Sequence, residues 1–179
     1  MKSPNKWKVR ENYDDLGGGL YDLRYKEEQS RKYDAAILIT LPRGDDLLLD
    51  NGCGTGMFLK RIDSPCVGID LSTGLLTVAK EKLKQNHCLV QGDSEHLPFR
   101  KGIFQGVYAV TLIQNLPEQE LAVLEMRRVS RASATLFITA LKAAFNKEYL
   151  AKLLKGRGFS RVNIVGDEGT NDWIACVKV

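Results

Sequence analysis

A glycine-rich turn is the feature whose residue types point most directly to chemistry. Residues 47–56 read LLLDNGCGTG, with glycine at positions 52, 54 and 56 after an apolar run that predicts a buried strand. Glycines between a strand and a helix let the backbone approach a ligand closely, and the helix start offers free N–H groups. The pattern indicates a nucleotide-type site, although an ordinary glycine-rich turn fits it as well.

An acid stands at the end of the next predicted strand. Asp70 closes the run CVGID, eighteen residues after Gly52. A carboxylate at this place can accept hydrogen bonds from both hydroxyls of a ribose, whereas the plainer interpretation is an acid that caps the following turn. The spacing from the glycine turn favours the ribose interpretation, and a nicotinamide enzyme would show the same two features.

A third polar segment follows the third predicted strand. Residues 91–99 read QGDSEHLPF. The Asp93 carboxylate can accept from an adenine amine, and the Ser94 backbone can donate to the ring. The apolar side of the adenine slot is expected to be closed by Leu97, Pro98 and Phe99.

A dinucleotide enzyme fits this sequence poorly. A GxGxxG pattern that starts at Gly52 requires glycine at position 57, where Met57 stands. A chain of 179 residues also leaves no room for a separate substrate domain. Both features argue against a nicotinamide oxidoreductase.

Strands that alternate with helices must position these residues. Such alternation predicts one α/β domain, with a mostly parallel sheet and helices on both faces. The predicted strands are 46–50, 66–70, 87–91, 106–111 and 134–141, followed by an antiparallel pair at 161–165 and 173–179. The predicted helices are about 23–40, from the glycine turn to 62, 74–85, 118–129 and 146–155.

Composition places the chain among ordinary globular proteins. It has 179 residues, of which 44% are hydrophobic and 27% charged, and no apolar run approaches the roughly 18 residues of a membrane helix. The lysine-rich start does not resemble a signal peptide. No cysteine pair has a metal-ligand or redox spacing, which predicts a reducing cytoplasm and no metal site. The cysteines are Cys53, Cys66, Cys88 and Cys176.

Taken together, these motifs resemble a class I S-adenosylmethionine-dependent methyltransferase, of the group that includes the ubiquinone and menaquinone biosynthesis methyltransferases. Residues 50–56 (DNGCGTG) are similar to the family's first motif, and 67–72 (VGIDLS) to its second. Residues 92–99 (GDSEHLPF) match the third, and 104–117 (FQGVYAVTLIQNLP) are similar to the fourth-strand motif. The resemblance runs from about residue 46 to the end of the chain.

The resemblance implies a Rossmann-like sheet of seven strands, the last one antiparallel, that binds S-adenosylmethionine. Gly52 and Gly54 would pass the methionine portion, Asp70 would hold the ribose and Leu71 would pack on the adenine. Tyr21, Tyr25 or Arg24 would cover the methionine end. The cofactor-binding set implied in this way is Asp50, Gly52, Cys53, Gly54, Asp70, Leu71, Asp93, Ser94, Tyr21 and Tyr25. An N-terminal cap at 1–35 would precede the methyltransferase domain at 36–179.

The sequence departs from the family pattern where the acceptor is expected. Relatives often carry an acid at the position of Gln105 and paired histidines at those of Gln114 and Asn115. Amides can orient an acceptor but cannot take its proton, so these two candidates suit an acceptor with its own lone pair, such as a ring nitrogen. A polar turn before Pro117 is the alternative interpretation.

Other candidates for acceptor chemistry are weak. His87 and His96 are expected to be structural or exposed. The Asn-Pro-Pro-aromatic motif of many amine methyltransferases is absent, which argues mildly against that chemistry.

The charge distribution bears on the partner. Residues 127–161 carry nine basic side chains and one acid, nine minus one giving a local charge of +8. This is either a solvated helix face or a surface for RNA or an acidic partner. With no sizeable insertion to close the site, we expect RNA or a ribosomal component as acceptor; a small-molecule methyltransferase and a non-catalytic module that binds the cofactor are the alternatives.

The third predicted strand is expected at a sheet edge. Its residues Cys88, Leu89 and Val90 are apolar. A small activator protein, such as the zinc-binding activator of several translation-related methyltransferases, would add a strand there.

Overall fold

One seven-stranded sheet organises the molecule, with strand order β3-β2-β1-β4-β5-β7-β6. The computed structural model describes residues 4–16, 18–166 and 169–179, without the side chains of residues 16–26. The strands are β1 (Leu48–Asn51), β2 (Cys66–Asp70), β3 (His87–Gln91), β4 (Phe104–Ala109), β5 (Ser130–Leu141), β6 (Arg161–Gly166) and β7 (Asp172–Lys178). Strand β7 runs antiparallel to both of its neighbours, β5 and β6, and the other strand pairs are parallel, which confirms the predicted Rossmann-like fold.

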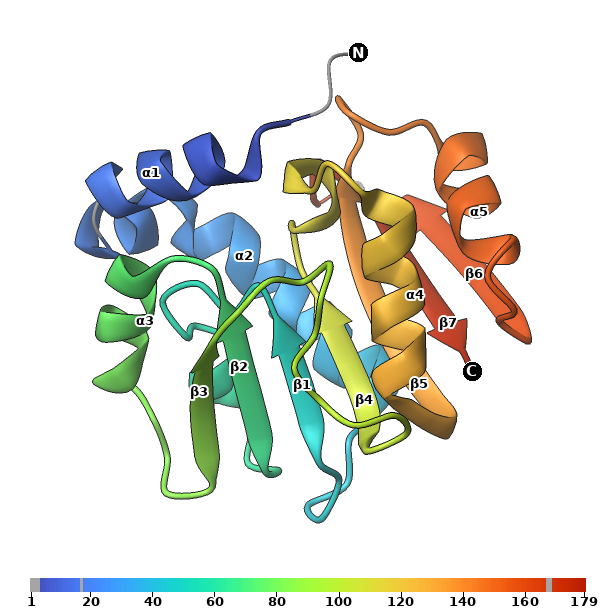
Figure 1. Ribbon diagram of the computed structural model, residues 1–179, viewed down its shortest axis with the longest axis horizontal. Helices are drawn as coiled ribbons and strands as arrows, with labels where there is room; N and C mark the ends of the chain where they lie inside the picture. Colours follow the sequence, from blue (N-terminus) through green and yellow to red (C-terminus); the bar gives the residue numbers. More distant parts are fainter. Residues whose placement is uncertain (1–3, 17, 167–168) are drawn as a thin grey trace.

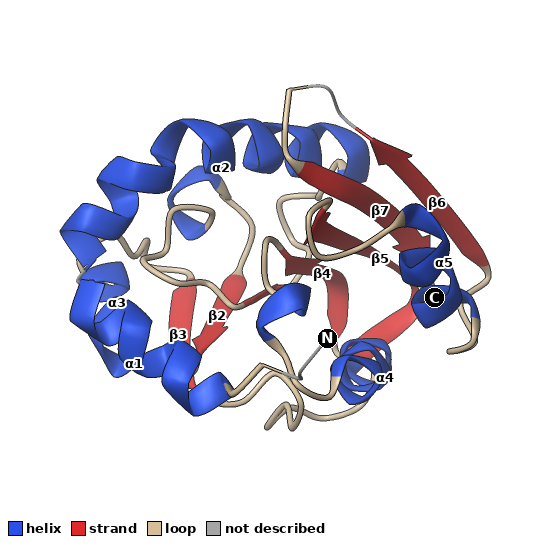
Figure 2. Ribbon diagram, turned by 90° about the horizontal axis from the view of Figure 1, so that it is seen from above, coloured by secondary structure: helices blue, strands red, loops and turns tan. Residues whose placement is uncertain are grey.

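Helices cover both faces of this sheet. Seen from above in Figure 2, α2 lies along one face, and α4 and α5 lie along the other. The α-helices are α1 (Lys6–Leu16), α2 (Gly18–Thr40), α3 (Thr73–Lys80), α4 (Gln119–Val129) and α5 (Lys147–Lys155), and two short 3₁₀ helices are η1 (Leu59–Arg61) and η2 (Ile113–Asn115). Figure 1 shows α1 across the carboxyl ends of the parallel strands.

The burial of both faces explains why the central strands are apolar without alternation. Leu48 packs in a core cluster with Phe58 and Tyr108 on the α2 side. Its neighbour Leu49 packs with Met126 in the cluster on the α4 side. Successive residues of a strand point to opposite faces, so a strand covered twice needs apolar residues throughout.

Several boundaries differ from those predicted. The expected helix after the glycine turn is only the 3₁₀ turn η1. Gly52, Gly54 and Gly56 have positive φ angles, which do not occur in a right-handed helix, so the chain can become helical only after them. Helix α3 ends at Lys80 instead of 85. The fourth strand ends at Ala109, so that Thr111 lies in the following turn.

The N-terminal part is more helical than the sequence predicted. Helix α1 was not predicted, and α2 begins at Gly18 and continues without a break to Thr40. The division into a cap at 1–35 and a domain at 36–179 therefore falls inside α2, and it stays a prediction.

The cysteines and the helices bear on disulfide bonding and on membrane insertion. All four cysteines are free thiols. Among the described residues, no helix has the length and hydrophobicity to span a membrane.

The final helix follows its sequence signals closely. Asn146 caps α5, its side chain accepting from the backbone N–H of Tyr149 at 2.7 Å, and Gly156 closes the helix.

Candidate functional site

A cavity lies at the carboxyl ends of β1, β2, β3 and β4, beneath α1. It contains about 700 Å³ of space that no atom fills, part of it open to solvent. The glycine turn and the acids after β2 and β3 meet there. The lining residues are Lys6, Val9, Arg10, Tyr13, Gly52, Gly54, Asp70, Leu71, Ser72, Leu75, Asp93, Ser94, Val110, Thr111, Leu112, Asn115 and Leu116.

The glycine turn leaves room that other residues would fill. Gly52, Gly54 and Gly56 have φ angles of 82°, 52° and 75°. A Cβ atom on Gly52 would lie 2.9 Å from Cδ1 of Leu112, another residue of the cavity wall. The shape of the glycine turn at the cavity therefore depends on glycine at position 52.

The backbone N–H groups of this turn are engaged within the protein. Those of Gly52 and Cys53 donate to the carbonyl of Ile69, at 2.8 and 3.0 Å, and that of Gly54 donates to Asp70 Oδ2 at 2.8 Å. The expected row of free N–H groups at a helix start is thus not what the turn offers. It offers close approach to the backbone.

Asp70 occupies the position predicted for a ribose-binding acid. Its Oδ1 accepts from the N–H of Ser72 at 2.9 Å, while Oδ2 accepts from Gly54. Burial raises the pKa of this carboxyl, although both backbone N–H groups act to lower it. Each carboxylate oxygen has a further lone pair, so Asp70 can still accept from a diol in the cavity.

Two buried polar residues at the end of β1 retain unused hydrogen-bonding atoms. Asp50 is 2% exposed, and within the described residues its Oδ2 and the Nδ2 of Asn51 have no partner. Burial, and next the charge of Asp70, raise the pKa of Asp50 to about 8. Neither residue is among those that line the cavity, although Gly52, which directly follows them, does line it.

The acid after β3 is bound by the N-terminal helix. Lys6 Nζ donates to Asp93 Oδ2 at 2.6 Å and also bonds to Glu95. Asp93 Oδ1 accepts from the Glu95 N–H at 3.0 Å, and Ser94 Oγ donates to Asn51 Oδ1 at 2.7 Å. Burial opposes the charge of Lys6, but Asp93 and Glu95 outweigh it and the pKa of Lys6 is raised.

Helix α1 forms a wall of the cavity that the sequence reasoning missed. Lys6, Val9, Arg10 and Tyr13 line it at the spacing of one helical face. Asn115 Nδ2 donates to the Tyr13 hydroxyl at 3.4 Å. The helical spacing of these four residues is visible in the sequence. They are mostly polar, however, and do not form the apolar stripe that usually marks a helix packed on a protein.

The C-terminal end of α1 is anchored near Asp70. Ser72 Oγ bonds to Asp14, and the N–H of Gly74 donates to Asp14 Oδ1 at 3.2 Å. Together with Lys6, Asp14 fixes both ends of the helix over the cavity.

The turn after β4 is strained and faces the same cavity. Thr111 has φ +57°, a conformation that costs a β-branched residue roughly 1–3 kcal/mol and is concentrated at functional sites. Its carbonyl accepts from Gln114 Nε2 at 2.6 Å and Asn115 Nδ2 at 3.4 Å. The side chain of Gln114 therefore folds back onto the turn, and of the two amide candidates only Asn115 lines the cavity.

Some predicted residues lie elsewhere. Cys53 is buried beneath the turn, in the core cluster on the α2 side. Leu97 and Phe99 pack in or against the opposite core, and like Pro98 they are not among the residues that line the cavity. Tyr21 and Tyr25 have side chains outside the described ones. The roles assigned to individual residues stay predictions.

Comparison with known proteins finds similarity to methyltransferases. A family model described as a methyltransferase domain matches residues 49–138. An uncharacterized protein of Methanocaldococcus jannaschii is 30% identical over 151 residues, covering 84% of this chain and 59% of that protein. The 18S rRNA (guanine-N(7))-methyltransferase of Schizosaccharomyces pombe is 31% identical over 134 residues, covering 71% and 50%. The demethylmenaquinone methyltransferase of Mycobacterium marinum is 32% identical over 119 residues, covering 61% and 50%.

The chain thus spans about half the length of these curated relatives. Solved structures share the fold at low identity. A chain in the complex between the Haloferax volcanii Trm112 methyltransferase activator and a methyltransferase matches with TM-score 0.82 and 12% identity, covering 95% of this chain and 96% of that one. The Haemonchus contortus phosphoethanolamine N-methyltransferase 2 in complex with S-adenosyl-L-methionine matches with TM-score 0.67 and 20% identity, covering 75% and 38%.

Proposed function

Because the chain belongs to the S-adenosylmethionine-dependent methyltransferase family, whose domain model matches residues 49–138, we propose that it transfers the methyl group of this cofactor to a nitrogen atom of RNA. The observation that carries the methyl-transfer part is the cavity itself. There the glycine turn, Asp70 and Asp93 surround space suited to a cationic nucleoside.

The residues present fit the cofactor. Asp70 would hold the ribose, Gly52 and Gly54 would pass the methionine portion and Asp93 would read the adenine edge. When bound, S-adenosylmethionine supplies an activated methyl group on its sulfonium. The protein must hold the acceptor about 3 Å from that carbon, in line with the departing sulfur, and exclude water.

The acceptor side of the cavity favours an atom with its own lone pair. Asn115, which lines the cavity next to Thr111, is an amide and cannot act as a general base. The two histidines do not supply one, since neither His87 nor His96 lines the cavity. A ring nitrogen of a base attacks without prior loss of a proton, and it suits this wall.

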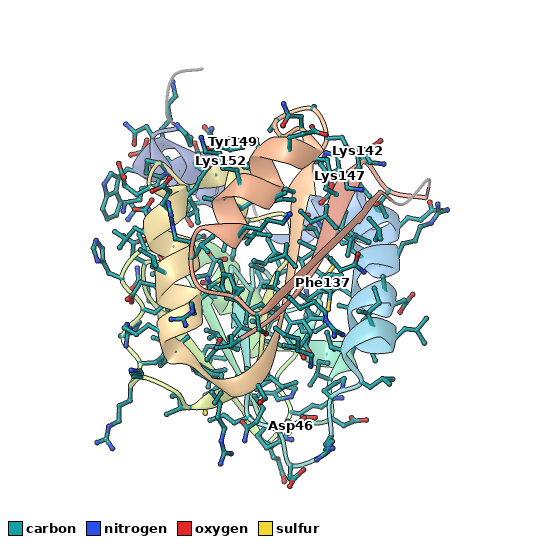
Figure 3. The ribbon with its side chains drawn as sticks, turned by 90° about the vertical axis from the view of Figure 1, so that its right-hand side faces the viewer. Asp46, Phe137, Lys142, Lys147, Tyr149 and Lys152 are labelled. Carbon is teal, nitrogen blue, oxygen red and sulfur yellow. The ribbon has the colours of Figure 1, made fainter. Side chains whose placement is uncertain are left out.

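An exposed basic surface supports RNA as the molecule that carries the acceptor. Lys142, Lys147 and Lys152 lie with Tyr149 at the same end of the molecule as α1 (Figure 3). Tyr149 is 48% exposed, and Lys147 and Lys152 make no ion pair with any described residue. Lysines beside an exposed aromatic ring provide phosphate contacts and a stacking surface.

Acidic residues of α4 neutralise part of the predicted basic stretch. Arg128 pairs with Glu125 and Arg157 pairs with Glu120. Arg128 and Arg157 are thus neutralised, whereas Lys147 and Lys152 of α5 make no ion pair with any described residue. The relationship to an 18S rRNA methyltransferase, at 31% identity, supports the same acceptor class.

The experiment that tests this function follows a methyl label. The chain is incubated with methyl-labelled S-adenosylmethionine and cell extract, which is then separated into RNA, protein and small molecules. We expect label in RNA, lost on nuclease treatment and reduced with the Asp70→Ala variant. Label confined to small molecules would refute RNA and favour a small-molecule methyltransferase; cofactor binding without any transfer would favour a non-catalytic module.

We also propose a small activator protein as partner at the edge formed by β3. The edge position of β3 in the sheet and the exposed Cys88 support a strand-adding partner. The structural likeness to the chain in the Trm112 complex supports its type. A Trm112 protein should co-purify with the chain and raise its turnover, and Cys88→Asp should weaken the complex. A chain that is fully active as a monomer and unaffected by Trm112 would refute this proposal.

A further inference from the structure

A buried ion pair lies behind the turn that follows β4. Lys32 of α2 is 1% exposed, and Asp172 at the start of β7 is 0% exposed. Lys32 Nζ lies 3.0 Å from Asp172 Oδ2 and 3.0 Å from a carboxylate oxygen of Glu28. A buried lysine is costly to desolvate, so its retention requires partners that hold it in place.

The pair is joined to Thr111, the strained residue of that turn. Thr111 Oγ1 accepts from Lys32 Nζ at 2.9 Å and from Gln29 Nε2 at 3.2 Å. The Thr111 N–H donates to Thr139 Oγ1 at 2.8 Å, and Thr139 donates in turn to Asp172 Oδ2 at 2.7 Å. Lys32 and Asp172 therefore hold the side chain and the backbone of Thr111 together.

The conformation of Thr111 determines what the turn presents to the cavity. Leu112 and Asn115 follow it and line the cavity, and Leu112 packs where a Cβ on Gly52 would lie. Thr111 has φ +57°, in the left-handed region that only glycine adopts without penalty. Without the bonds to its hydroxyl, we expect the turn to relax and move both side chains.

We propose that Lys32, together with Asp172, is a positioning residue for methyl transfer. The pair holds the turn after β4 in its left-handed form, and so holds Leu112 and Asn115 where donor and acceptor meet. Lys32 itself does not line the cavity. This inference rests on the proposed methyl transfer, and it does not depend on the class of acceptor.

The test combines loss of the pair with relief of the strain. Lys32→Met alone leaves Asp172 buried without its cation and can impair folding, so Lys32→Met/Asp172→Asn removes both charges. The third variant adds Thr111→Gly to that pair, because glycine keeps a left-handed φ without the hydroxyl bonds. Arg31→Met, on the exposed face of α2, is the matched control.

Two quantities are measured on folded protein. These are the turnover of labelled S-adenosylmethionine with total extract and the Kd of S-adenosylhomocysteine by calorimetry. We expect the neutralised pair to lose turnover by about 100-fold, the scale of a small misplacement, while the Kd changes less than about threefold because the other three loops are intact. Addition of Thr111→Gly should restore about tenfold of that turnover, in line with the penalty for a left-handed non-glycine residue.

The outcomes separate the two proposals. Normal turnover of the neutralised pair, or loss that Thr111→Gly fails to relieve, overturns the positioning role and leaves the pair a stabilising element only. A wild-type chain that binds S-adenosylhomocysteine but transfers no methyl group instead refutes the proposed function.

Discussion

The Nζ atom of Lys6 lies 2.6 Å from Oδ2 of Asp93, so the first helix is bound to the acid expected to read the adenine. The same lysine bonds to Glu95, which is almost fully buried. Helix α1 is thus held at the cavity in part by Asp93, the acid that we propose reads the adenine. We therefore predict that docking of α1 and binding of the cofactor are coupled.

Lys6→Met should loosen α1. Hydrogen bonds to charged groups contribute about 1.5–3 kcal/mol, so the amides of Lys6–Leu16 should exchange about 10- to 100-fold faster with deuterium. Lys8→Met is the control, because Lys8 is exposed on the same helix. Equal exchange of α1 in the two variants would show that Lys6 does not anchor it.

Asp70→Ala should weaken the binding of S-adenosylmethionine. The loss of hydrogen bonds to a charged acceptor predicts about 1–3 kcal/mol in binding free energy, measured by calorimetry. Asp63→Ala, which removes an exposed acid, is the control and should bind normally. Unchanged affinity of the Asp70 variant would remove its assignment to the ribose.

The raised pKa of Asp50 should make the protein without bound cofactor less stable as the pH rises. The pKa of Asp50 is about 8 in the folded protein, against an ordinary value of 3.8. Between these values the folded state binds the proton and the unfolded state does not, so the free energy of unfolding falls with rising pH, by at most about 1.4 kcal/mol per unit.

Asp50→Asn should flatten that decline, as measured by urea unfolding from about pH 5 to about pH 8. Asp45→Asn, at an exposed position, should keep the wild-type slope. An unchanged slope in the Asp50 variant would mean that this carboxyl is already ionised at neutral pH.

Gly52→Ala should damage the cofactor site more than the fold. The new Cβ would lie 2.9 Å from Leu112 Cδ1, at a φ of 82°. We expect about 1–2 kcal/mol lower stability and cofactor affinity reduced by about tenfold or more. Gly44→Ala, whose Cβ would meet nothing within 4 Å, is the matched control. Equal affinity in both variants would exclude close approach of the cofactor at Gly52.

The parts of the fold that local patterns encode were predictable from the sequence. The central strands are buried on both faces and read as continuous apolar runs, and Asn146 and Gly156 mark the ends of α5. Asp70 and Asp93 were placed at one cavity because the carboxyl ends of parallel strands meet at one edge.

The remainder depends on contacts between distant segments. Lys6 meets Asp93 across 87 positions of the chain, and Lys32 meets Asp172 inside the protein. Local propensity gives no sign of such pairs. The left-handed conformation of Thr111 was not predicted for the same reason, since a β-branched residue is a poor candidate for positive φ until its partners are known.

The structure of the chain in complex with S-adenosylhomocysteine tests the central claim most directly. We expect the adenosyl group in the cavity beneath α1, with its ribose on Asp70 and its sulfur facing the turn at Thr111. A complex in which this compound binds elsewhere, or a cavity that stays empty at saturating concentration, would contradict the assignment of this site.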